Sequence, residues 1–97
     1  MRYFHRGHCT PEKALAFAGK FFLSRGFQEG PATAERAVFT DGRGAVEVAV
    51  DVEGGHYTCV TVATREVGES EVDRLARRFL AELHAVEEPA HAVRGAY

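Results

Sequence analysis

The stretch GAVEVAVDVEGGHYTCVTVATR, residues 44–65, decides the fold of this chain. Apolar and other side chains alternate with a period of two over 44–53 and again over 57–65, a pattern typical of half-buried β-strands. The glycines between the two runs suit the left-handed backbone of a tight turn. The stretch therefore predicts an antiparallel hairpin with one apolar face.

The length of the hairpin loop decides which side chains share that face. A two-residue loop would pair Val50 with Cys59, whereas a three-residue loop, 54–56, pairs Val50 with Val60. A slip of one residue turns every side chain of a strand to the other face, so only the longer loop gathers the valines on one side. We therefore predict the three-residue loop, with Tyr57 and Cys59 on the opposite face. The residues expected on the apolar face are Val46, Val48, Val50, Val60 and Val62.

Two further strands are predicted beside the hairpin. Residues 35–40, ERAVFT, precede the turn DGRG at 41–44, and this turn pairs Phe39 with Val46 on the apolar face. Residues 2–6, RYFHR, have the composition of a short strand at the N-terminus.

Two helices are predicted outside these strands. Over 70–86 apolar residues recur at helical spacing, and Ser70 is placed to cap the first turn. Over 11–25 a second helix begins after the cap residue Thr10 and ends before Gly26, which suits a left-handed C-terminal cap. The apolar stripe of the later helix consists of Val72, Leu75, Ala76, Phe79, Leu80 and Leu83.

These elements predict an α+β fold in the order β-α-β-β-β-α. We expect one four-stranded, mostly antiparallel sheet with both helices packed on its valine face. The strand at 2–6 is expected to run parallel to the strand at 35–40, through a right-handed crossover that contains the first helix. A single domain over 1–88 and a C-terminal tail over 89–97 complete the prediction.

The composition limits the classes of partner. The chain has 97 residues, a net charge of −2 and two cysteines, with no apolar N-terminal run typical of a signal peptide. We therefore expect a cytoplasmic protein with reduced thiols that binds neither nucleic acid nor membranes. The order of elements resembles that of double-stranded-RNA-binding domains and of ribosome-hibernation factors. The last helix of those RNA-binding domains begins with lysines, where this chain has ESEVDR at 69–74, so the order alone assigns no family.

Two short motifs carry residue types that bind metals. FHRGHCT at 4–10 contains His5, His8 and Cys9, and HYTC at 56–59 contains His56 and Cys59. A zinc site requires all ligand atoms within about 2.0–2.3 Å of the ion. The expected topology places the two motifs at opposite ends of the sheet, so we predict neither a metal nor another cofactor.

The same topology suggests a possible small-molecule or anion site. Both helices are expected to begin at one end of the sheet, and helix N-termini bind anions through their free N–H groups. Cys9 lies close to one of these helix N-termini, whose partial positive charge favours a thiolate. The candidate ligand-binding residues are His8, Cys9, Thr10, Arg43 and Arg65.

The main functional hypothesis concerns the face of the sheet that the helices leave uncovered. Its expected residues are small or amphipathic, which is typical of surfaces that pack against another protein. We expect a protein-association module without enzymatic activity that forms a homodimer, and the small-ligand site is the alternative. The candidate interface residues are Tyr3, Arg36, Val38, Glu47, Ala49, Asp51, Tyr57 and Thr61.

Overall fold

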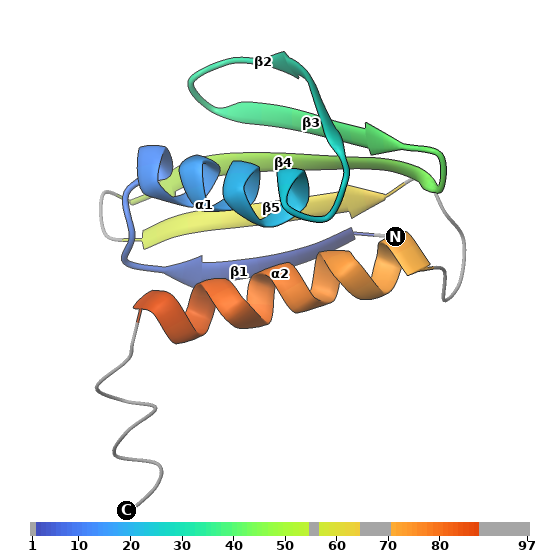
Figure 1. The fold of residues 1–97 in the computed structure, drawn as a ribbon. Helices are drawn as coiled ribbons and strands as arrows, with labels where there is room; N and C mark the ends of the chain where they lie inside the picture. The colour runs from blue at the N-terminus through green and yellow to red at the C-terminus, as the bar shows by residue number, and fades with distance from the viewer. Residues whose placement is uncertain (1, 55–56, 65–70, 88–97) are drawn as a thin grey trace, which may run out of the picture.

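A computed structural model describes residues 2–54, 57–64 and 71–87 of the chain. The elements are β1 (Arg2–Gly7), α1 (Pro11–Leu23), β2 (Gln28–Ala32), β3 (Arg36–Asp41), β4 (Gly44–Glu53), β5 (Tyr57–Thr64) and α2 (Glu71–Glu87). They form an α+β fold with one five-stranded antiparallel sheet, in the order β1-β5-β4-β3-β2. Both helices pack on one face of the sheet (Figure 1). The expected cap Ser70 and the tail at 89–97 lie outside the described residues.

The predicted hairpin register is confirmed. Val50 pairs with Val60 and Val48 with Val62, and the loop begins at Gly54, whose φ of 59° lies in the left-handed region. The valines predicted on the apolar face are all buried. The predicted pairing of Phe39 with Val46 is also present, so three strands contribute to one apolar surface.

Helix α1 begins at the predicted residue and ends at Leu23, two residues before the predicted end. The side chain of Thr10 accepts a hydrogen bond from the backbone N–H of Lys13, and Gly26 has a φ of 89°. The N–H of Phe27 then donates to the carbonyl of Phe22, and the two rings lie 5.3 Å apart. This Schellman motif returns the chain to the core as soon as the helix ends.

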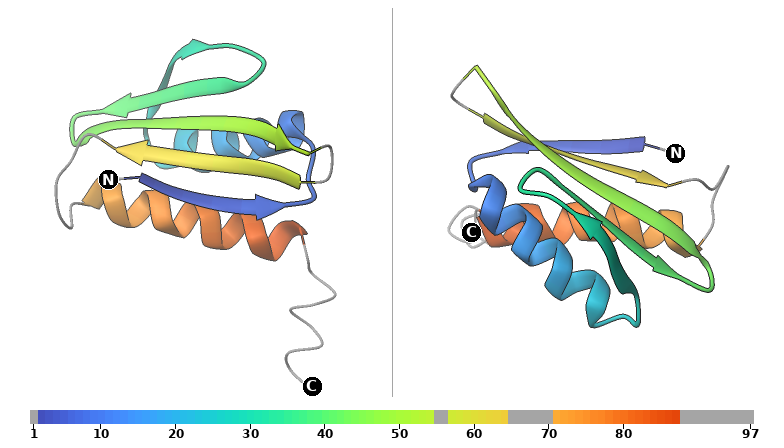
Figure 2. Two further views of the ribbon diagram at one scale, coloured as in Figure 1. Left: turned by 180° about the vertical axis from the view of Figure 1, so that it is seen from behind. Right: turned by 90° about the horizontal axis from the view of Figure 1, so that it is seen from above.

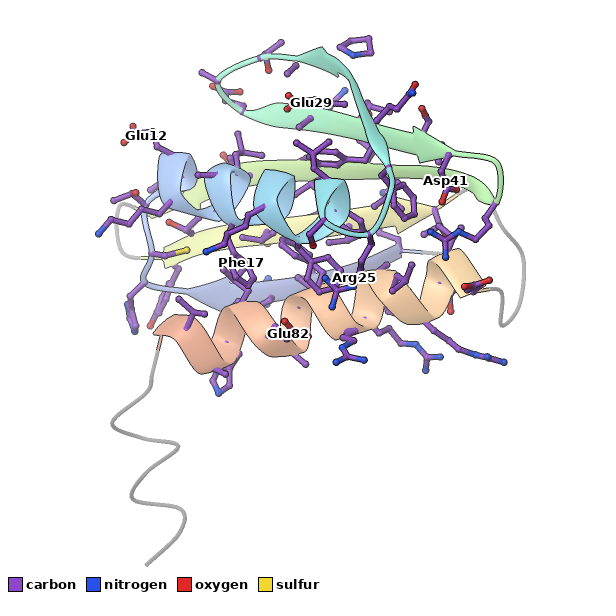
Figure 3. The ribbon with its side chains drawn as sticks, viewed as in Figure 1. Glu12, Phe17, Arg25, Glu29, Asp41 and Glu82 are labelled. Carbon is purple, nitrogen blue, oxygen red and sulfur yellow. The ribbon has the colours of Figure 1, made fainter. Side chains whose placement is uncertain are left out.

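Aromatic rings join the helices to the sheet. Phe22 of α1 stacks on Phe39 of β3 at 5.2 Å, and Phe79 of α2 lies 5.4 Å from Phe22. Phe17 also reaches from α1 to Phe79, with 5.9 Å between the ring centroids (Figure 3). The predicted stripe of α2 faces this core, because Val72, Phe79 and its other members are buried or partly buried.

The prediction of four strands is wrong, because β2 adds a fifth. This strand pairs antiparallel with β3, and its register shifts between Glu29 and Ala32. All of its residues are exposed, and they include Gly30 and Pro31. An exposed edge strand with an irregular register needs no alternation of apolar residues, so its sequence carries no strand pattern.

The prediction that the first strand runs parallel to the strand at 35–40 is also wrong. The strand that follows α1 is β2, which runs parallel to β1, so β3 runs antiparallel to β1. Strand β1 lies at the opposite edge of the sheet from β2 and pairs antiparallel with β5. The direction of β1 is therefore reversed relative to the prediction. As a result, α1 begins beside the β4–β5 hairpin, whereas α2 begins at the other end of the sheet (Figure 1).

Neither helix that the structure describes combines the length and hydrophobicity that crossing a bilayer requires.

Burial of the valine face predicts a strong effect of position along β4. Val50→Asp should destabilise the domain by several kcal/mol, because a carboxylate would be buried without a partner. Val52→Asp makes the same change two residues further along β4, where the side chain is 51% exposed, so it is the matched control and should fold. Urea unfolding followed by circular dichroism measures both variants. Equal stability of the two variants would contradict the burial of Val50.

Candidate functional site

The candidate site is the open face, the side of the sheet opposite α1 and α2. The left view of Figure 2 shows β3, β4, β5 and β1 from this side, with α1 behind the sheet and α2 below β1. We define the open face by its residues in each strand. They are Arg2, Phe4 and Arg6 in β1; Tyr57, Cys59, Thr61 and Ala63 in β5; Ala45, Glu47, Ala49 and Asp51 in β4; and Arg36, Val38 and Thr40 in β3.

Strand register arranges these residues in rows across the sheet. The middle row runs Phe4, Thr61, Ala49, Arg36. The row on one side of it runs Arg2, Ala63, Glu47, Val38, and the row on the other side runs Arg6, Cys59, Asp51. Small side chains therefore occupy the centre of the open face, with aromatic and charged residues around them.

Seven of the eight predicted interface residues lie on the open face, and Tyr3 does not. Tyr3 pairs with Val62 and so faces the helices, where its hydroxyl donates to the carboxylate of Asp73 at 2.7 and 2.8 Å. His5 faces the same way, and its ring lies 5.4 Å from that of His84. The prediction for Tyr3 is wrong because β1 pairs with β5 in the register that turns its odd-numbered residues inward.

Three open-face residues of β1 were missed by sequence reasoning, namely Phe4 and its neighbours Arg2 and Arg6. The side chain of Phe4 is 60% exposed, and the guanidinium of Arg6 lies 5.0 Å from its ring centroid. A signal for this orientation is present in the sequence. Arg2 and Arg6 alternate with Phe4, and arginine side chains rarely face a core.

The open face is hollowed as well as uncovered. A hollow of about 380 Å³, here called the Arg36 hollow, has among its lining residues Arg36, Ala49, Asp51, Cys59 and Thr61. Arg36 also lies 3.6 Å from Glu47 in an exposed ion pair. The lining thus combines short side chains with one cation, Arg36, and two carboxylates, Glu35 and Asp51.

Cys59 of the HYTC motif lies near the same end of the sheet as His8 and Cys9, contrary to prediction. The ring of His8 lies 5.9 Å from that of Tyr57, because the reversed β1 ends beside the start of β5. His56 is outside the described residues. Among the residues that the structure does describe, no three or more His, Cys, Asp or Glu side chains are grouped to hold a metal ion.

His8 and Cys9 line a different hollow, of about 290 Å³, between the two helices. We call it the Cys9 hollow. Lys13 and Phe17 of α1 and Leu83 and Val86 of α2 complete its lining. Its walls are mainly apolar, with one lysine at the edge.

The predicted anion site at a shared helix end is not formed. His8, Cys9 and Thr10 lie at the start of α1, whereas Arg43 lies at the opposite end of the sheet, near the start of α2. Thr10 is already the cap of α1, and Arg65 lies outside the described residues. The reason is again the reversed direction of β1.

Arg43 is engaged in a structural cluster. Its side chain donates to Asp41 at 2.6 Å and to Glu71 at 2.7 Å, and more weakly to the carbonyl of Arg25 at 3.3 Å. Desolvation of the Asp41 carboxyl group opposes its ionisation and raises its pKa. The hydrogen bonds and the charge of Arg43, together with a hydrogen bond from the N–H of Gly44, outweigh this effect, so the pKa of Asp41 is lowered. The cluster ties the β3–β4 turn, near Asp41 in Figure 3, to the first turn of α2.

Comparison of the chain with protein-family models, with curated proteins and with solved structures finds no match.

The lowered pKa of Asp41 predicts a pH-dependent contribution to stability. The contribution is present above the carboxyl's unfolded pKa, about 3.9, and is lost as the pH falls through the lower folded value. Asp41→Asn should therefore lower the urea midpoint at neutral pH, and the difference from wild type should shrink at about pH 2.5. Glu29→Gln removes the same charge from an exposed position of β2 and serves as control. A difference for Asp41→Asn that does not change with pH would contradict this account.

Proposed function

We propose that this protein is a non-enzymatic association module that acts through the open face, and that its partner is a second copy of the chain. The observation that carries the proposal is the asymmetry of the sheet. Both described helices cover one face, while the other presents Phe4 at 60% and Tyr57 at 49% exposure beside a centre of small residues. Contiguous surfaces of this kind are typical of interaction sites.

The composition of the open face supports a protein partner. Interfaces are enriched in aromatic residues and arginine, and their centres are depleted of charge. Phe4 and Arg36 flank the centre of the open face, Ala49 and Thr61 form it, and Tyr57 lies at the start of β5. The acidic Glu47 and Asp51 of β4 weaken any attraction for a polyanion, so the charge pattern favours a protein over a nucleic acid.

The size of the open face also suits a dimer. Strand spacing and rise give a four-strand surface of roughly 20 by 25 Å in projection. The side chains that project from this surface bring its accessible area near the roughly 800 Å² that each partner buries in a specific interface. A second copy would add buried area to a chain of 97 residues, whose own core is small.

The Cys9 hollow favours a second candidate function, the binding of a small apolar anion. Its volume of about 290 Å³ is close to the lower end of the range for ligand sites. Phe17, Leu83 and Val86 would contact the apolar part of the ligand, and Lys13 would pair with its charge. This proposal keeps His8 and Cys9 as ligand-binding residues and assigns no role to Arg43.

Binding of anilinonaphthalene sulfonate, an apolar anion, tests the second candidate. Lys13→Gln should weaken binding about tenfold, because the charged partner of the sulfonate is lost. Lys20→Gln, on the same helix but outside the hollow, is the control. Fluorescence titration measures both affinities, and equal affinities for the two variants would exclude this use of the hollow.

The main proposal predicts that wild-type protein is a dimer at micromolar concentration and that Ala49→Arg is a monomer. The substitution places a long charged side chain at the centre of the open face. Ala16→Arg makes the same change at an exposed position of α1 and should leave the dimer intact. Sedimentation equilibrium measures all three proteins. A monomeric wild type, or an Ala49→Arg dimer as tight as wild type, would refute the proposal.

A further inference from the structure

We infer that the two copies pair about a twofold axis parallel to their strands, so that Phe4 of each chain enters the Arg36 hollow of the other. The inference rests on the proposed association through the open face. It adds a defined contact, with Phe4 as the inserted side chain and the Arg36 hollow as its receptor.

Register places the two parts of this contact at opposite ends of one row. The middle row begins with Phe4 in β1, crosses Thr61 and Ala49, and ends with Arg36 in β3. A twofold axis along the strands, between β4 and β5, sets this row against the same row of the partner in reverse order. Phe4 of one chain then lies opposite Arg36 of the other, and Thr61 lies opposite Ala49.

The hollow can accept an aromatic ring. Its volume is about 380 Å³, whereas an apolar cavity of about 150 Å³ suffices to bind benzene. Ala49 and Thr61 lie within it and have short side chains. Arg36 lies at its wall with a side chain 60% exposed, so its guanidinium can lie over the ring of Phe4 in a cation–π contact.

Charge distribution selects this axis over the perpendicular one. On the open face β1 carries Arg2 and Arg6, whereas β4 carries Glu47 and Asp51 in the corresponding rows. An axis along the strands keeps each row opposite itself, so each arginine approaches the carboxylate of its own row in the partner. An axis across the strands would exchange the two outer rows, setting Arg2 against Arg6 and Glu47 against Asp51. Like charges placed opposite each other cost several kcal/mol at an interface.

Sedimentation equilibrium of Phe4→Ala tests the inference. The dimer dissociation constant should rise by about 30-fold or more, which is the loss expected when an aromatic side chain that fills a pocket of the partner is removed. Val86→Ala is the matched control, since Val86 is also 60% exposed but lies on α2. Circular dichroism confirms that each variant is folded.

Mixing variants tests whether the contact joins two chains. A mixed dimer of Phe4→Ala with Arg36→Ala retains one intact Phe4–Arg36 contact, so it should be more stable than the mean of the two homodimers. A mixed dimer whose stability equals that mean would overturn the inference.

If Phe4→Ala dimerises as tightly as wild type while Ala49→Arg is monomeric, the axis is wrong and the association through the open face stands. If Ala49→Arg also dimerises, both proposals fail.

Discussion

The register between β4 and β5 is the constraint on which the rest of the structure depends. Pairing Val50 with Val60 turns the valines of both strands toward α1 and α2. The same pairing leaves Ala49 and Thr61 beside each other on the open face. Because side chains alternate along a strand, a single choice of loop length determines both the hydrophobic core and the candidate interface.

The edges of the sheet impose the second constraint. Strand β2 forms one edge of the sheet beside β3, and β1 forms the opposite edge, where it pairs antiparallel with β5. This pairing places the basic residues Arg2 and Arg6 at one border of the open face, two strands away from the acidic Glu47 and Asp51. In the proposed dimer, this separation of charge brings the arginines of one chain near the carboxylates of the other.

The elements that the sequence predicts correctly are those with a strong local pattern. The hairpin alternates with period two, α2 has a complete apolar stripe, and α1 is bounded by Thr10 and Gly26. Strand β2 could not be predicted in this way, because QEGPA is exposed, contains Pro31 and packs no side chain in the core. The position of β1 depends on β2, so one missed edge strand also reversed β1 and moved the ends of both helices.

The residues of the candidate site were likewise predicted correctly only where the sequence has a strong local pattern. Its residues in β3, β4 and β5 were predicted from alternation and lie on the open face, whereas Tyr3 of β1 points to Asp73 and Phe4 takes its place. The ligand site expected around His8 and Arg43 failed for a related reason, since it depended on the ends of helices rather than on a local pattern. Long-range pairing, not side-chain chemistry, was the missing information.

The most direct test of the central claim is an isotope-filtered nuclear Overhauser measurement on a mixture of labelled and unlabelled chains. This measurement detects only contacts between different molecules. The account predicts contacts between open-face residues of the two chains, including the ring of Phe4 with the methyl group of Ala49. An absence of such contacts at concentrations where the protein is dimeric, or contacts confined to α1 and α2, would contradict it.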